Sequence, residues 1–126
     1  MTISYEILLH GNFRADVRKT LRRYAMLRKR LIVGLERLGQ GPRGKHAPMR
    51  GVRDPETQGL YRRTYVGNHR LIYLLDEQSK RIVPVFLSDK PRSDDTYVGW
   101  QEVARQITDD YRSSDFDKFS IWQGEL

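Results

Sequence analysis

The first half of the chain carries an apolar stripe with helical spacing. Large apolar residues recur three or four positions apart over residues 13–38, and charged residues fill the positions between them. This spacing predicts amphipathic helix, which Asn12 would begin as N-cap and the glycines and proline of residues 39–42 would end. Periodicity alone does not separate one long helix from two. We expect a helical hairpin with a break near residues 24–27.

Short runs rich in β-branched and aromatic residues flank this helical region. They predict a first strand over residues 4–9 and three more over residues 60–66, 69–75 and 81–87. The last three are joined by connections too short for a crossover, so they must be antiparallel neighbours. Pro84 lies within the last run and cannot donate a ladder hydrogen bond. We therefore expect an edge position or a β-bulge there.

The last 29 residues, 98–126, add a further element. Apolar residues at helical spacing mark one face of a short helix, and they are Trp100, Val103, Ala104, Ile107 and Tyr111. The favoured interpretation is an extra structural helix that covers the sheet or the other helices, with a tail packed on the same domain. An alternative is that the acidic tail shades a basic site.

These patterns predict one α+β domain, in which a small antiparallel sheet packs against an N-terminal helical hairpin with an extra C-terminal helix. A length of 126 residues suits one domain. The absence of cysteine excludes disulfides and thiolate zinc sites, and the three histidines lack metal-ligand spacing. The N-terminus resembles neither a signal peptide nor a membrane span. We expect a cytoplasmic protein that needs no metal, cofactor or membrane.

Positive charge is concentrated in one part of the chain. Residues 12–53 hold 13 Lys and Arg against Asp16 and Glu36, a net charge of +11, whereas residues 54–126 have a net charge of −3. Most of these cations are arginine, which holds phosphate in a bidentate fork. The asymmetry indicates a polyanionic partner. The alternative is a solvated helix surface that happens to be rich in arginine.

The segment 59–73 carries the most specific motif. It reads Gly-Leu-Tyr-Arg-Arg-Thr-Tyr-Val-Gly-Asn-His-Arg-Leu-Ile-Tyr. A tyrosine with basic residues, a turn, and then aromatic-Arg-hydrophobic-hydrophobic-Tyr resembles the central signature of the RelE/ParE toxin–antitoxin superfamily, with His69 in place of the usual aromatic. The helical region and its Leu-x-x-Gly-Pro ending resemble that family's N-terminal helices. The resemblance covers residues 4–97 and implies a toxin domain over 1–97, with 98–126 running past the family's usual end.

The resemblance implies a RelE-like mRNA interferase, an endoribonuclease toxin that cuts messenger RNA on the ribosome and blocks translation. It also implies a cognate antitoxin protein as partner. Cleavage in the family proceeds without metal, by attack of a ribose 2′-hydroxyl on the adjacent phosphate, and leaves a 2′,3′-cyclic end. This reaction needs a proton acceptor, a proton donor for the leaving 5′-oxygen and cations for the developing phosphate charge.

The same resemblance assigns catalytic positions on two strands. Arg70 would be the phosphate-stabilising arginine, and the alternative is a plain ion pair with Asp76 or another surface acid. Arg63 would supply a second cation from the preceding strand. Arg62 stays open for that role, because neighbouring strand residues face opposite sides and only one can reach the site. His69 should face away from Arg70, so we expect it to pack rather than to catalyse.

The loop after the last predicted strand would supply the rest of the site. Tyr97 would stack on a base or orient the scissile phosphate, or would instead anchor the C-terminal helix. Lys90 or Arg92 would supply the acid or a cation, lysine being the easier acid. Relatives keep a His-Arg or Lys-Arg cluster here, whereas this loop has no histidine and has Pro91 at one expected basic position. The expected RNA-binding residues are Arg62, Lys45, Arg50 and Arg53.

Two other functions compete with the nuclease. A ParE-like inhibitor of DNA gyrase would belong to the same superfamily. Such relatives generally lack the basic residues and the tyrosine that correspond here to Arg70, Lys90, Arg92 and Tyr97. A non-catalytic basic RNA- or ribosome-binding module would show strong salt dependence and leave RNA intact.

Overall fold

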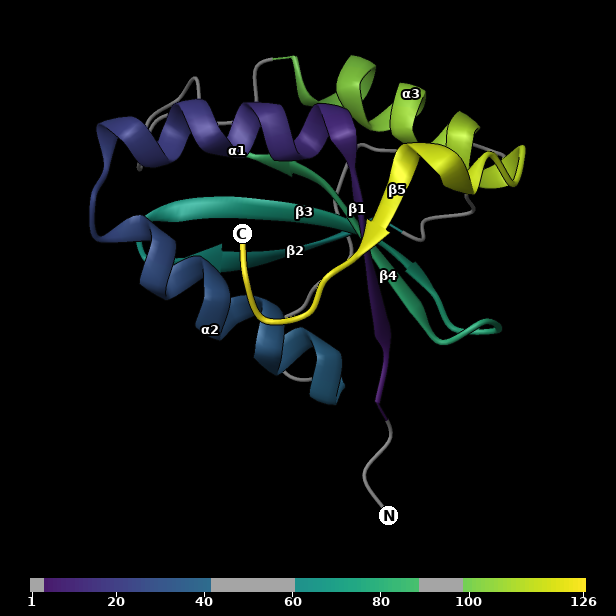
Figure 1. The fold of residues 1–126 in the computed structure, drawn as a ribbon, viewed down its shortest axis with the longest axis horizontal. Coiled ribbons are helices and arrows are strands. Elements are labelled where there is room, and N and C mark those ends of the chain that lie inside the picture. Colours follow the sequence, from purple (N-terminus) through teal and green to yellow (C-terminus); the bar gives the residue numbers. More distant parts are fainter. Residues whose placement is uncertain (1–3, 42–60, 89–98) are drawn as a thin grey trace.

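The computed structural model describes residues 4–41, 61–88 and 99–126 (Figure 1). An α+β fold is confirmed, and no helix in these ranges is long and apolar enough to cross a membrane. The elements are β1 (Glu6–His10), α1 (Gly11–Arg23), α2 (Leu27–Gln40), β2 (Tyr61–Val66), β3 (His69–Asp76), β4 (Arg81–Leu87), α3 (Trp100–Arg112), the 3₁₀ turn η1 (Phe116–Lys118) and β5 (Phe119–Ile121). The expected break between two N-terminal helices is confirmed at residues 24–26.

The sheet is mixed, with the strand order β2-β3-β4-β1-β5. The strands β2, β3 and β4 form the antiparallel meander that their short connections require. The prediction of a purely antiparallel sheet is wrong, because β1 lies parallel to β4. The long connection through α1 and α2 leaves β1 free to join the sheet in either direction. The edge strand β5, which pairs antiparallel with β1, was not predicted, because three residues are too few to show an alternating pattern.

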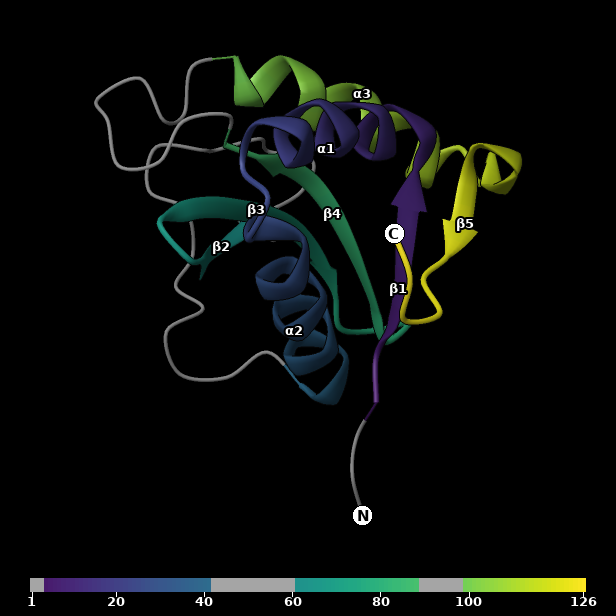
Figure 2. The same cartoon turned by 60° about the vertical axis from the view of Figure 1, so that its left-hand side comes forward.

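Helices lie against both faces of this sheet (Figure 2). On one face Tyr24, between α1 and α2, packs its ring edge-on against His69, and Gly34 of α2 lies against Val66. On the other face Tyr61 hydrogen-bonds to Thr108 of α3. The apolar stripe of α1 and α2 enters the core as the spacing predicts, with Phe13, Val17, Leu31, Leu35 and Leu38 buried.

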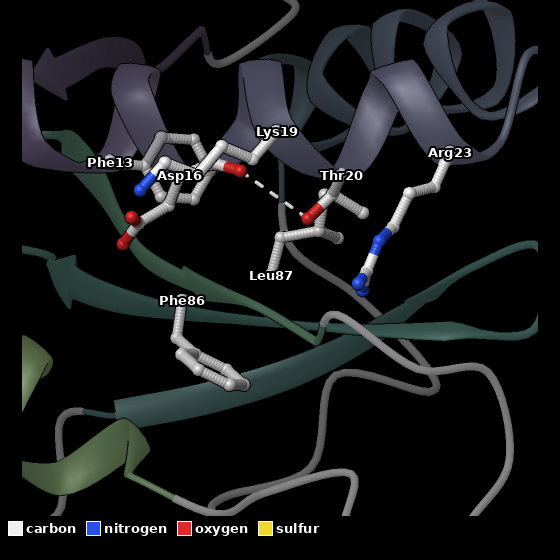
Figure 3. Close-up of a pocket in the computed structure, with 7 residues that line it drawn as sticks. All are labelled: Phe13, Asp16, Lys19, Thr20, Arg23, Phe86 and Leu87. Atoms are coloured by element: carbon white, nitrogen blue, oxygen red, sulfur yellow. Dashed lines mark hydrogen bonds between the residues drawn. The ribbon is translucent and has the colours of Figure 1, made fainter.

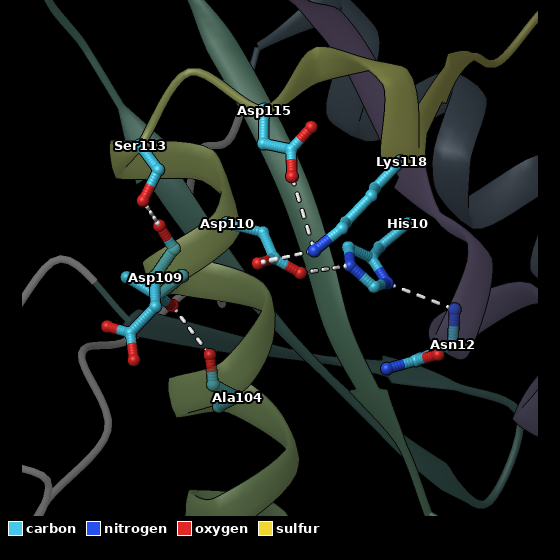
Figure 4. Close-up of polar contacts among 9 residues, drawn as sticks. His10, Asn12, Ala104, Asp109, Asp110, Ser113, Asp115 and Lys118 are labelled. Atoms are coloured by element: carbon cyan, nitrogen blue, oxygen red, sulfur yellow. Dashed lines mark hydrogen bonds and ion pairs between the residues drawn. The ribbon is translucent and has the colours of Figure 1, made fainter.

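The N-cap of α1 is His10, so the prediction of Asn12 as the N-cap is wrong. The Asn12 backbone N–H donates to Nδ1 of His10 at 3.0 Å, so Asn12 already lies inside the helix. Because Nδ1 accepts this bond, Nε2 carries the ring proton and donates it to Asp110 Oδ2 at 2.7 Å. One buried imidazole thus caps α1 and attaches α3 (Figure 4). An imidazole is an uncommon cap, and the sequence rules favour a small polar residue at this position.

Polar side chains from three strands hold α3 on its face of the sheet. His10 of β1 bonds to Asp110, Tyr61 of β2 to Thr108, and Asp76 of β3 accepts a 2.5 Å hydrogen bond from the Tyr111 hydroxyl. Burial raises the pKa of Tyr111 to about 12, and the hydrogen bond to Asp76 adds to the rise. The C-terminal helix is therefore an integral layer of the domain.

The contact of Asp110 predicts a pH dependence of stability. The hydrogen bond from His10 lowers the pKa of Asp110, burial opposes this, and Lys118 at 3.3 Å lowers it further. A lowered pKa in the folded state stabilises the fold above the unfolded value of about 4, and the stabilisation is lost as the pH falls through the folded value. We expect Asp110→Asn to lower the free energy of unfolding by about 1–2 kcal/mol at pH 6.

Urea titrations of wild type and Asp110→Asn at pH 6 and at pH 3 measure this difference. The difference should be smaller at pH 3 than at pH 6, because the stabilisation is lost progressively as the pH falls below the unfolded value of about 4 toward the lowered folded value. Asp109→Asn, at an exposed position on the same helix, is the control and should stay near wild type at both pH values. A penalty for Asp110→Asn that is equal at both pH values contradicts the assignment.

Candidate functional site

The strand register assigns the two neighbouring arginines of β2 to opposite faces. Arg63 pairs with Ile72, and the next residue on its face, Tyr65, pairs with Arg70. Directly opposed residues in an antiparallel pair share a face. Arg63, Tyr65 and Arg70 therefore form one group on the α3 side of the sheet, and they are called the arginine–tyrosine cluster below. Arg62 pairs with Tyr73 and lies on the face of α1 and α2.

The placement of Arg62 also appears in the electrostatics. Burial raises the pKa of Tyr73, and the positive charge of Arg62 opposes that rise. The same charge contributes to the lowered pKa of Glu77, which is mainly set by a hydrogen bond from Tyr5. Arg62 thus acts on groups away from Arg70, and Arg63 is the arginine of this pair that shares a face with it.

The guanidinium of Arg70 lies over an aromatic ring. Its Cζ is 4.2 Å from the ring centroid of Tyr65, and its Nη1 donates to the carbonyl of Asn68 at 3.2 Å. The alternative of an ion pair with Asp76 is wrong, because that carboxylate accepts from Tyr111 and from the backbone of Ser79. No carboxylate within the described ranges pairs with Arg70. With Tyr65 47% exposed, the cluster offers a cation and an aromatic face to a ligand.

Ser88 fixes the main chain of Arg70 at the end of β4. The Arg70 N–H donates to Ser88 Oγ at 2.8 Å, and the Ser88 N–H donates to the Arg70 carbonyl at 2.8 Å. His69 Nδ1 donates to the Ser88 carbonyl at 2.8 Å from the opposite face. His69 is buried and also contacts Tyr24, so the prediction that it packs away from Arg70 is confirmed. Ser88 is a functional candidate that the sequence did not single out.

A β-bulge adds Phe86 to the face of the cluster. Up to Pro84 the strand pairs regularly with β3, where Pro84 opposes Tyr73, but Phe86 then opposes Ile72 and leaves Val85 as the extra residue. Without the bulge, Phe86 would oppose Leu71 and face the helical hairpin. The alternative of a bulge next to Pro84 is thus confirmed. Bulges re-aim side chains in this way.

The Ser88 contacts predict a loss of stability on mutation. Ser88→Ala removes the acceptor of the Arg70 N–H, and we expect the free energy of unfolding to fall by about 1–2 kcal/mol. Ser113→Ala, which removes an exposed hydroxyl at the end of α3, is the matched control and should stay within about 0.5 kcal/mol of wild type. Urea denaturation measures both values. Equal effects of the two substitutions would refute a special role for Ser88.

Several expected site residues lie outside the described residues. They are Lys45, Arg50, Arg53, Lys90, Arg92 and Tyr97. The described part of the site can hold a phosphate between Arg63 and Arg70 and can stack a base on Tyr65. Neither guanidinium exchanges its proton near neutral pH, so proton transfer to and from a substrate would need other groups. Across the described ranges, no three His, Asp or Glu side chains are grouped so as to hold a metal ion.

Comparisons with protein-family models, with curated proteins and with solved structures find no match to this chain.

Proposed function

We propose that the protein is the toxin of a type II toxin–antitoxin system and a metal-independent endoribonuclease that cuts messenger RNA on the ribosome. The observation that carries the proposal is the arginine–tyrosine cluster. Two arginines and a partly exposed tyrosine share one sheet face, Arg70 has no carboxylate partner within the described ranges, and Ser88 fixes its main chain. The class of reaction, RNA cleavage, is inferred from the resemblance of the motif around Arg70 to the RelE/ParE superfamily.

In the proposed reaction the 2′-hydroxyl of one ribose attacks the adjacent phosphorus, the bond to the 5′-oxygen breaks, and a 2′,3′-cyclic phosphate is left. Arg70 and Arg63 would stabilise the charge that develops on the phosphate oxygens. Tyr65 would stack on a base next to the scissile bond. A base must take the 2′-hydroxyl proton and an acid must supply one to the leaving oxygen. On the family resemblance, Lys90 or Arg92 would supply the acid or a further cation, lysine being the easier acid, and Tyr97 would stack on a base or orient the scissile phosphate.

The charge of the helical hairpin supports a large polyanionic partner. The helices α1 and α2 carry nine Lys and Arg against Asp16 and Glu36, and eight of those nine cations are exposed. Contacts to phosphates give strong affinity without reading sequence. A ribosome carrying mRNA supplies such a surface. We propose a cognate antitoxin protein as the second partner and the cytoplasm as the site of action.

Primer extension on an mRNA translated in a reconstituted system tests the proposal. Purified protein should produce new cuts within codons that occupy the ribosomal A site. A block of protein synthesis without any cut would favour a non-catalytic ribosome-binding module. Unaffected synthesis together with inhibited supercoiling by DNA gyrase would favour the gyrase inhibitor, and either result would overturn the nuclease.

A further inference from the structure

A cavity lies between α1 and the C-terminal end of β4 (Figure 3). Its volume is about 350 Å³, which is within the range of small-ligand sites. Asp16, Lys19 and Arg23 line it from α1, and Phe86 and Leu87 line it from β4. The fold creates this space because β1 pairs with β4 at Arg81 and Ile82, after which the two strands diverge and α1 crosses the gap (Figure 2).

The cavity lies next to the arginine–tyrosine cluster. Leu87 directly precedes Ser88, whose N–H and Oγ bind the main chain of Arg70. Neighbouring strands are about 4.8 Å apart, so only the width of β4 separates Arg70 on β3 from the cavity on the other side. Phe86 belongs to both places, because the bulge turns it to the face of Arg70 while it also lines the cavity.

The lining combines the groups that one nucleotide requires. Lys19 and Arg23 are one helical turn apart and exposed, so both can contact the same phosphate. No carboxylate of the described residues pairs with Lys19. Phe86 is half-buried and offers an aromatic surface for a base, and the Asp16 carboxylate can accept a hydrogen bond from an amino group of the base.

We infer that the cavity is a second subsite for single-stranded RNA, which binds the nucleotide next to the one held at Arg70; this rests on the proposed nuclease function. The phosphate of that nucleotide lies at Lys19 and Arg23, and its base lies against Phe86. The RNA strand then crosses the end of β4, from the cluster on one side to α1 on the other. The subsite sets how long an RNA segment the protein holds.

Fluorescence anisotropy with labelled 2′-O-methyl oligonucleotides tests the subsite, because the blocked 2′-oxygen prevents cleavage. The double variant Lys19→Ala/Arg23→Ala should bind a six-nucleotide strand about tenfold more weakly than wild type, and should bind a single 2′-O-methyl nucleotide, which cannot span the cluster and the cavity, unchanged. The slope of log affinity against log salt should decrease in magnitude by about 0.7 for the longer strand, the value for one phosphate. Circular dichroism and the thermal midpoint verify that the double variant folds. If it is unstable, the single variant Lys19→Gln replaces it in the binding experiment.

The matched control is Arg18→Ala/Arg22→Ala, which removes the same charge from exposed positions of the same helix that do not line this cavity. It should weaken binding of the longer strand less than about threefold. Equal losses in the two double variants would show a general charge effect and overturn the subsite. Adenosine monophosphate that binds as tightly as the six-nucleotide strand, with the same dependence on Lys19 and Arg23, would also overturn it in favour of a free-nucleotide site.

The variant Arg70→Ala separates failure of the subsite from failure of the function. If Arg70→Ala loses both the six-nucleotide strand and the single nucleotide while Lys19→Ala/Arg23→Ala behaves like its control, the cluster binds RNA and the subsite is wrong. If wild type binds neither the six-nucleotide strand nor the single nucleotide, the proposed function and the subsite both fail.

Discussion

The substitution Arg70→Ala is expected to lower the single-turnover rate of mRNA cleavage on the ribosome by about 100- to 1,000-fold, the usual cost of losing one group that stabilises transition-state charge. The guanidinium lies over Tyr65 at 4.2 Å and has no carboxylate partner among the described residues. Its positive charge is therefore available to a phosphate. Because the side chain is only partly buried, stability should change by less than about 1 kcal/mol. Quenched-flow cleavage of a programmed ribosome complex gives the rate.

Two controls define what Arg70 contributes. Arg70→Lys keeps the charge but loses the fork, so it should recover only part of the rate. Arg105→Ala removes one arginine from an exposed position on α3 and should cut at the wild-type rate. An Arg70→Ala variant as active as Arg105→Ala would remove Arg70 from the site. Arg63→Ala should also slow cleavage more than Arg62→Ala, since only Arg63 shares the face of Arg70.

The substitution Trp100→Ala is expected to lower the free energy of unfolding by about 3–5 kcal/mol, the range for removing a large aromatic side chain from a core. Trp100 begins α3, is 3% exposed and packs edge-on against Tyr61 with ring centroids 5.7 Å apart. Its loss would leave a cavity between α3 and the sheet. The result measures how much the packing of α3 on the sheet contributes to the stability of the domain.

Trp122→Ala is the matched control for this substitution. Trp122 is half-buried, and its indole Nε1 has no hydrogen-bond partner among the described residues, so its removal should cost about 1–2 kcal/mol. Urea denaturation gives both values, and the slope against urea should stay unchanged if both variants unfold in one step. A loss for Trp100→Ala no greater than that for Trp122→Ala would contradict the view that α3 is an integral layer.

Local sequence patterns predicted the meander and the helical hairpin, and they gave a bulge as one of two alternatives at Pro84, because each of these features depends on residues close together in the chain. The parallel pairing of β1 with β4 does not depend on residues close together in the chain, and the sequence did not predict it. It joins residues about 75 positions apart, such as Glu6 and Arg81, and a long connection allows either strand direction. The cap at His10 was missed because an imidazole is an uncommon cap, and its contact with Asp110 was missed because the two residues lie 100 positions apart.

Some features of the candidate site also followed from local sequence patterns, whereas others depend on contacts between strands. Alternation along β2 showed that only one of Arg62 and Arg63 can share a face with Arg70, but the choice needed the register between β2 and β3. Ser88 and Phe86 were missed because a serine and a phenylalanine at the end of a strand carry no signal of their own. The hydrogen bonds of Ser88 to Arg70 and the extra residue of the bulge give them their places. A register shift of one residue moves each side chain to the opposite face.

The most direct test of RNA cleavage by 2′-hydroxyl attack uses two mRNAs on programmed ribosomes, identical except for a single 2′-deoxy nucleotide at the mapped cut. We expect the protein to cut the unmodified mRNA, leaving a 2′,3′-cyclic phosphate on the upstream fragment, and to leave the 2′-deoxy mRNA intact at that position. Equal cutting of both mRNAs would refute attack by the 2′-hydroxyl, and cutting of neither would refute the ribonuclease itself.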